Sequence, residues 1–121
     1  MIEKTVIDWL NLQLDGIPAY SQEPESTMVP GDGVFVVVEK TGSSMKNHIW
    51  TGIFAIQSYA PTLYEAAGLN ERVKAAMFNI VNLDVITRAE LNSDYNFTNT
   101  SKKQFRYQAV FELTHYELKG E

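Results

Sequence analysis

Residues 48–59 read HIWTGIFAIQSY, a run that is apolar on both faces of an extended chain. Side chains alternate along a strand, which sorts this run into two sets. One set is Ile49, Ile53, Ala55 and Tyr59, and the other is Trp50, Phe54 and Ile56. A strand with large apolar side chains on both faces is covered on both sides. The run therefore predicts a long strand in the centre of a sheet.

The chain before this run predicts a second buried strand at residues 34–38, VFVVV, because β-branched and aromatic residues favour strands. Residues 41–44, TGSS, are typical of the turn between the two strands. Residues 21–33 carry prolines and glycines among polar residues and predict a loop, and residues 17–20 could form a short extended piece.

Two helices are expected, one before and one after these strands in the sequence. Ile2, Val6 and Leu10 recur at helical spacing near the N-terminus, and Gly16 would end that helix. The segment 61–65, PTLYE, predicts a helix start in which Thr62 and Glu65 form a capping box. The helix behind it contains Gly68, which costs about 1 kcal/mol relative to alanine, so we expect close packing to explain it.

Two alternating patterns, residues 83–91 and 105–113, predict the last strands. The polar segment 92–103 between them predicts a protruding loop or arm, and residues 117–121 predict a short tail. The chain is thus expected to be a single α+β domain over residues 1–121. It would have a mixed, mainly antiparallel sheet of about four strands, with two helices packed on one face and a long arm between the last two strands.

Composition limits the classes of function. The net charge is −5 and the sequence pI about 5.0, so the chain has no surplus of cations with which to grip nucleic acid phosphates. It has 0 cysteines, which excludes disulfides, thiolate metal sites and cysteine nucleophiles. We identify no targeting segment and no run approaching the roughly 18 apolar residues of a membrane helix, so we expect a cytosolic protein without a membrane partner.

No motif for catalysis or metal binding is evident. His48 and His115 lack the spacing of a zinc site. The glycines of 31–33, GDG, lead into a strand, whereas phosphate loops open a helix. Ser58 is not in a nucleophile elbow. We therefore predict no catalytic, cofactor-binding or metal-binding residue, no cofactor and no enzymatic activity.

Two features of the arm point instead to a contact surface: interleaved aromatic residues and a basic cluster in an otherwise acidic chain. The candidate assembly interface is Asp94, Tyr95, Asn96, Phe97, Lys102, Lys103, Arg106 and Tyr107. Two alternatives stay open at this point. The arm could fold back and bury its aromatic residues, and the cations could form an ordinary solvated face.

Several short segments, taken in order, carry a resemblance to a known family. They are 39–42 EKTG, 47–49 NHI, 56–61 IQSYAP, 66–71 AAGLNE, 73–74 VK, 91–98 LNSDYNFT and 106–110 RYQAV. The chain resembles, roughly from Trp9 to Tyr116, the small minor capsid proteins of tailed bacteriophages and prophages of Gram-positive bacteria. That group is related to tail terminator, or tail completion, proteins.

The resemblance implies a structural virion protein at the head–tail junction. Proteins of this kind form a ring, commonly a hexamer, that caps the tail tube and docks the head. The implied partners are copies of the chain itself, the tail tube protein and head-connector proteins, while DNA passes through without specific binding. The implied location is the host bacterial cytoplasm during assembly and then the virion. A head-completion or connector protein of the same joint is the alternative, and an unrelated small enzyme or regulatory domain is a third.

Overall fold

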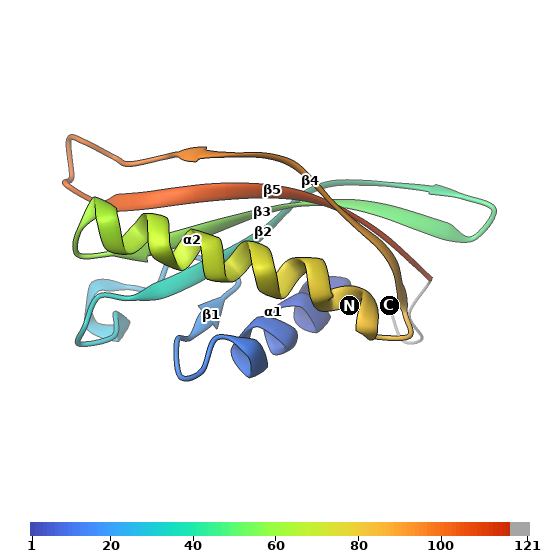
Figure 1. The fold of residues 1–121 in the computed structure, drawn as a ribbon, viewed down its shortest axis with the longest axis horizontal. Coiled ribbons are helices and arrows are strands. Elements are labelled where there is room, and N and C mark those ends of the chain that lie inside the picture. The colour runs from blue at the N-terminus through green and yellow to red at the C-terminus, as the bar shows by residue number, and fades with distance from the viewer. Residues whose placement is uncertain (117–121) are drawn as a thin grey trace.

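The computed structural model describes residues 1–116 and shows an α+β fold with one sheet (Figure 1). The elements are α1 (Ile2–Gln13), β1 (Ala19–Tyr20), the 3₁₀ turn η1 (Ser26–Met28), β2 (Phe35–Lys46), β3 (Ile49–Ala60), α2 (Leu63–Phe78), the 3₁₀ turn η2 (Asn79–Asn82), β4 (Ile86–Asn96) and β5 (Phe105–Tyr116). The sheet has the order β1-β2-β3-β5-β4. β1 is parallel to β2 and every other pair is antiparallel, as expected of a mixed, mainly antiparallel sheet. The fifth strand is the extended piece at Ala19–Tyr20.

The predicted central strand is β3, which is hydrogen-bonded to β2 on one side and to β5 on the other. Phe54 and Ile56 point to the helices and are both 0% exposed. Ala55 and Tyr59 point to the opposite face and are 5% and 4% exposed. The prediction of a strand buried on both faces is confirmed.

Both helices pack on the same face of the sheet, as predicted (Figure 1). Val6 of α1 and Val73 of α2 are fully buried in one core with Phe54 and Phe111. Each such side chain contributes roughly 1.5–3 kcal/mol by leaving water. A hydrogen bond of 2.8 Å from Trp9 Nε1 to the carbonyl of Ala76 ties the two helices together.

The helix boundaries follow the expected local chemistry. The backbone N–H of Glu65 donates to Thr62 Oγ1 at 3.1 Å, which is the half of the capping box that Thr62 supplies. Gly16 has φ +89° just after α1, a conformation that glycine adopts without strain. We expected close packing to explain Gly68, but a Cβ built there would meet nothing within 4 Å. Close packing therefore does not explain this glycine.

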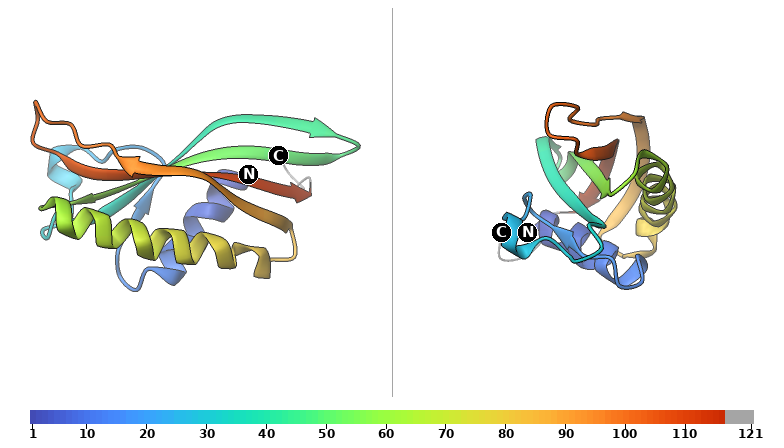
Figure 2. Two further views of the ribbon diagram at one scale, coloured as in Figure 1. Left: turned by 45° about the horizontal axis from the view of Figure 1, so that its top comes forward. Right: turned by 90° about the vertical axis from the view of Figure 1, so that its left-hand side faces the viewer.

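The predicted turn at residues 41–44 is wrong. These residues belong to β2, which continues to Lys46, and the turn is made by Asn47 and His48 at φ 55° and 65°. A register shift between Lys40 and Gly42 accommodates the polar residues inside the strand. The result is a long β2–β3 hairpin that extends past the helices at one end of the molecule (Figures 1 and 2).

The predicted boundaries around β4 are also corrected. Residues 83–85 precede the strand, and β4 runs on to Asn96. Residues 92–96 therefore belong to the strand rather than to an arm, and residues 93–96 are paired with β5. Register shifts at Ile86/Arg88 and Leu91/Ser93 explain why the alternation is imperfect. The remaining loop, residues 97–104, closes with a bridge between Asn99 and Gln104. The predicted tail, residues 117–121, lies outside the described residues.

Candidate assembly surface

The structure divides the eight predicted contact residues among three places. Tyr95 and Arg106 lie on the face of the sheet opposite the helices, which we call the open face, and Phe97 joins them. Asp94 points the other way, toward α2. Lys102 and Lys103 are exposed in the loop that joins β4 to β5.

The remaining two predicted contact residues, Asn96 and Tyr107, lie at the end of β4 and the start of β5. Asn96 accepts the N–H and O–H of Thr98 through Oδ1, at 3.0 and 2.6 Å, and so shapes the start of the loop. Tyr107 is half-buried and sits opposite Asn96 in the strand register, on the helix side of β5. The eight residues therefore do not lie on one surface, and their role in assembly stays a prediction.

Arg106 is the organising residue of the open face. Its guanidinium carbon lies 4.5 Å from the ring centre of Phe97 and 5.5 Å from that of Tyr59, distances typical of cation–π contacts. Arg106 Nε donates to the carbonyl of Phe97 at 2.7 Å, and Nη1 donates to Tyr59 Oη at 2.8 Å. These contacts fix the side chain in one position between two aromatic rings.

A chain of hydrogen bonds runs across three strands from Arg106. Tyr59 Oη, which accepts from Arg106, donates to Gln57 Oε1 at 3.4 Å. Gln57 Nε2 donates to Gln108 Oε1 at 2.9 Å, and Gln108 Nε2 donates to Tyr95 Oη. Each group donates to the next, so the bonds polarise one another in the same direction. The chain ends at the hydroxyl of Tyr95, whose side chain is 42% exposed.

Tyr59 is the buried centre of this network. Its ring stacks on Phe35 with centroids 4.4 Å apart and is 4% exposed. Burial raises the pKa of Tyr59 above its ordinary value, and this effect outweighs the hydrogen bond and the positive charge of Arg106, which lower that pKa. The phenol is therefore neutral at physiological pH and can serve as both donor and acceptor.

Asp94 has a structural role on the helix side. Lys74 Nζ of α2 lies 3.3 Å from Asp94 Oδ2 and 3.1 Å from Glu71 Oε1, and the Lys74 side chain is only 16% exposed. Its hydrogen bond to Glu71, followed by that to Asp94, raises the pKa of Lys74. Asn70 Nδ2 also donates to Asp94, at 3.4 Å. These bonds attach α2 to β4.

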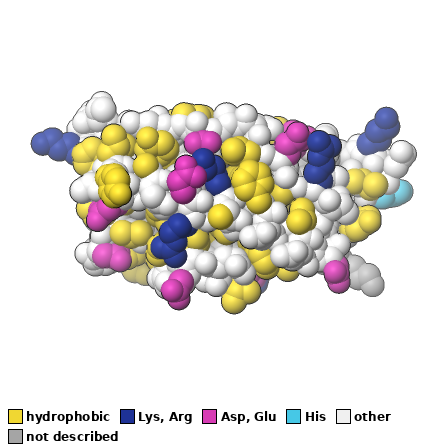
Figure 3. Space-filling view, viewed as in Figure 1, with side chains coloured by type: hydrophobic (Ala, Val, Ile, Leu, Met, Phe, Trp, Pro, Cys, Tyr) yellow, Lys and Arg dark blue, Asp and Glu magenta, His cyan; other side chains and the backbone are white. Residues whose placement is uncertain are grey.

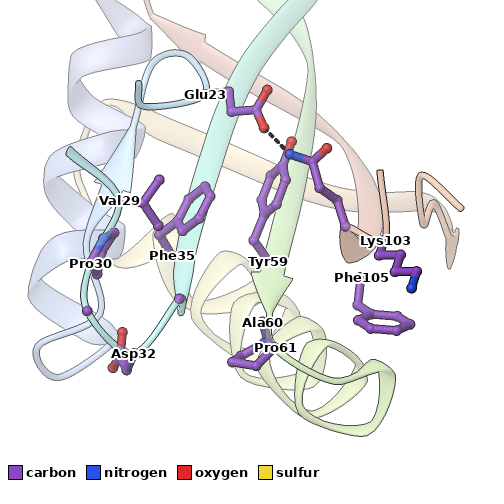
Figure 4. Close-up of a pocket in the computed structure, with 13 residues that line it drawn as sticks. Glu23, Val29, Pro30, Asp32, Phe35, Tyr59, Ala60, Pro61, Lys103 and Phe105 are labelled. Carbon is purple, nitrogen blue, oxygen red and sulfur yellow. Dashed lines mark hydrogen bonds between the residues drawn. The ribbon is translucent and has the colours of Figure 1, made fainter. Parts of the chain in front are cut away.

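The loop 97–104 folds back toward the N-terminal part of the chain. Gln104 Nε2 donates to Glu23 Oε1 at 2.7 Å, which joins this loop to the loop after β1. The two loops border an open hollow of about 450 Å³, whose floor is the Phe35–Tyr59 stack (Figure 4). The loop is therefore packed against the body at its base, and its two lysines stay exposed.

The histidines and the buried serine noted in the sequence lie apart from one another within residues 1–116. No group of three or more His, Cys, Asp or Glu side chains there is placed to hold a metal ion. His48 is exposed in the hairpin turn, whereas His115, near the C-terminal end of β5, is paired with Trp50 and is 3% exposed. Ser58 is 0% exposed, and its Oγ has no hydrogen-bond partner among the described residues. No helix of that part of the chain has the length and hydrophobicity needed to cross a membrane.

The comparisons with known proteins give no family for this chain. No protein-family model matches the sequence, and the search of curated proteins finds no match.

Three members of the open-face network were not among the predicted contact residues: Tyr59, Gln57 and Gln108. A signal was present, because Gln57 interrupts an apolar strand and Gln108 interrupts another. Two long polar side chains in the middle of buried strands need partners. Their pairing could be inferred only with the register of β3 against β5, in which these two residues are directly opposite.

Proposed function

We propose that this chain is a structural protein of the bacteriophage virion at the head–tail junction. In this proposal it is a tail terminator-like minor capsid protein that forms a ring, caps the tail tube and docks the head. It would work in the host bacterial cytoplasm during assembly and remain in the virion. Its partners would be copies of itself, the tail tube protein and head-connector proteins.

One observation supports this reading more than any other: the chain's own helices cover only one face of the sheet. The open face carries a rigid network of one arginine, two tyrosines and two glutamines, bordered by Phe97. Arginine and tyrosine are enriched among the residues that dominate binding at protein interfaces. Because Arg106 is already held in place, little conformational entropy is lost when a partner binds there.

The end of the hydrogen-bond chain gives the surface a specific contact. Tyr95 accepts from Gln108, and the described residues provide no acceptor for its own O–H. That donor is polarised by the preceding bonds, and Tyr95 as a whole residue is 42% exposed. A partner that presents a carbonyl or carboxylate oxygen beside Phe97 would complete the chain, which supports docking of a protein surface at this site.

The charge of the chain is compatible with a ring through which DNA moves. A net charge of −5 does not favour tight binding of the phosphate backbone. Duplex DNA could therefore pass without being retained.

The experiment is electron microscopy of particles produced without this chain. A tail terminator predicts abnormally long tails that are not attached to heads. The alternative, a head-completion or connector protein of the same joint, predicts heads that lack tails and lose DNA. Particles of normal appearance would rule out both and favour a protein that is unrelated to the virion.

A variant connects this phenotype to the open face. Phe97→Ser removes one of the two aromatic rings that contact Arg106. Because Phe97 is already 37% exposed, the fold should survive. We expect it to reproduce the defect of the particles without the chain. The control is Leu12→Ser on α1, because Leu12 is 73% exposed and lies on the helix side.

A further inference from the structure

The two ends of the molecule differ in shape. The view along the shortest axis places the tip of the β2–β3 hairpin at one end (Figure 1). The loop 97–104 and the loop before β2, which border the hollow, lie at the opposite end. The hairpin tip extends beyond the helices (Figure 2), so the molecule has a projection at one end and a hollow at the other.

The hairpin tip carries exposed apolar side chains on both of its faces. Met45 is 50% exposed on the helix side, and Ile49 is 42% exposed on the open side. The turn between them needs only Asn47 and His48, both at positive φ, so the tip is as narrow as two paired strands. Lys46 adds a positive charge at the tip, and the space-filling view shows hydrophobic side chains with a cation at this end (Figure 3).

The hollow has the complementary chemistry. Its floor is apolar and aromatic, formed chiefly by Phe35 and Tyr59 with prolines at its sides (Figure 4). Its rim carries the carboxylates of Glu23 and Asp32 and the ammonium of Lys103, a net negative charge of one. The projection is apolar and carries a cation, and the recess is apolar with two carboxylates and one ammonium at its rim, so the two surfaces are complementary in chemistry.

We propose that the β2–β3 hairpin tip of one copy docks in the hollow of a second copy. This inference rests on the proposed function, because it names the contact by which such a ring would close. Met45 and Ile49 would enter the hollow, and Lys46 would face Asp32. Because the tip and the hollow are different surfaces at opposite ends, the contact is head-to-tail and repeats from one copy to the next. Such contacts close into a ring when the rotation per copy allows it.

The geometry excludes an intramolecular version of this contact, since the tip and the hollow are at opposite ends of one rigid sheet (Figure 1). A second copy fits better than an unrelated partner because the chain itself supplies both halves. Apolar side chains are present at both ends, and the charges at the two ends are opposite in sign.

Site-directed cross-linking tests this contact directly, because the natural chain has 0 cysteines. Ser44→Cys is nearly isosteric and leaves Met45 and Lys46 in place at the tip. Gly31→Cys places a thiol at the hollow, where a Cβ would meet nothing within 4 Å. The two proteins, one with an affinity tag, are mixed at high concentration and oxidised with copper–phenanthroline.

We expect the mixed Ser44→Cys and Gly31→Cys pair to give severalfold more tagged heterodimer than a mixture of Ser44→Cys with Leu12→Cys. A chain with both substitutions should give a ladder of higher oligomers, which single substitutions cannot form. Adding Lys46→Glu should lower the yield severalfold. Equal yields for the two mixtures would overturn the inference.

The cross-linking result and the virion result test the hairpin contact and the proposed function separately. A chain that caps tails but gives no cross-link above the control would keep the proposed function and exclude this interface. A specific cross-link in a protein that is absent from virions would keep the interface and exclude the proposed function.

Discussion

The substitution Tyr59→Phe breaks the open-face hydrogen-bond chain near its start while keeping its packing. The ring stays in place against Phe35, at a centroid distance of 4.4 Å. The hydroxyl that accepts from Arg106 at 2.8 Å and donates to Gln57 at 3.4 Å is removed. The change therefore isolates the polar contribution of one atom.

The expected loss can be estimated from these contacts. A hydrogen bond to a charged group contributes about 1.5–3 kcal/mol, and a long neutral one contributes less than about 1 kcal/mol. Arg106 is half-buried and keeps its bond to the Phe97 carbonyl, so the lower end of the range applies. We expect the free energy of unfolding to fall by about 1.5 kcal/mol, which lowers Tm by roughly 4–8 °C for a domain of this size.

Urea and thermal unfolding at neutral pH measure this loss. The matched control is Tyr64→Phe, which removes a hydroxyl from a tyrosine that is 89% exposed and should change the free energy of unfolding by less than about 0.5 kcal/mol. Equal effects of the two substitutions would refute the reasoning. A double-mutant cycle with Arg106→Lys should then show that the two side chains are coupled.

The raised pKa of Tyr59 makes the free energy of unfolding depend on pH. The folded state holds the phenolic proton more tightly than the unfolded state, because the pKa of Tyr59 is raised by burial. This contribution to stability is complete below the unfolded pKa of about 10 and is lost as the pH rises through the folded value. The wild type should therefore lose more stability than Tyr59→Phe above pH about 10. Parallel stability curves in this range would contradict the assignment.

Three further substitutions test the fold. Asp94→Asn should lower the free energy of unfolding by about 1 kcal/mol at neutral pH, since it weakens the bond to the poorly exposed Lys74, and denaturant unfolding would show this. Gly52→Ala should cost about 1–3 kcal/mol, because its Cβ would lie 2.9 Å from Cε2 of the buried Phe54. Gly68→Ala should instead stabilise by up to about 1 kcal/mol, because nothing within 4 Å opposes the new methyl group in α2. A gain at Gly52 or a loss at Gly68 would contradict the packing described.

The elements with strong periodic or capping signals could be predicted from sequence. The two-sided apolar pattern of residues 48–59 correctly indicated the central strand, and Thr62 correctly marked the start of α2. These signals are local, because the residues that produce them are neighbours along the chain. The class of fold followed from their order.

The errors came from features that depend on pairing partners. Residues 41–44 have turn chemistry, but residues 42–44 stay paired with β3 beyond the bulge at Lys40/Gly42. Residues 92–96 are polar because they lie on an edge strand, rather than in a free loop. The candidate surface was only partly predicted, since Tyr95, Phe97 and Arg106 converge whereas Asp94 faces α2. Which face each residue takes depends on two register shifts in β4 that the alternation of residues does not reveal.

The position of this chain in assembled particles bears on the proposed function as a whole. Virions produced by the genome that encodes the chain can be purified, labelled with gold-conjugated antibody against it and imaged by electron microscopy. We predict that the chain copurifies with the particles and that the gold lies at the joint between head and tail. Purified virions that do not contain the chain would contradict a structural role in the particle.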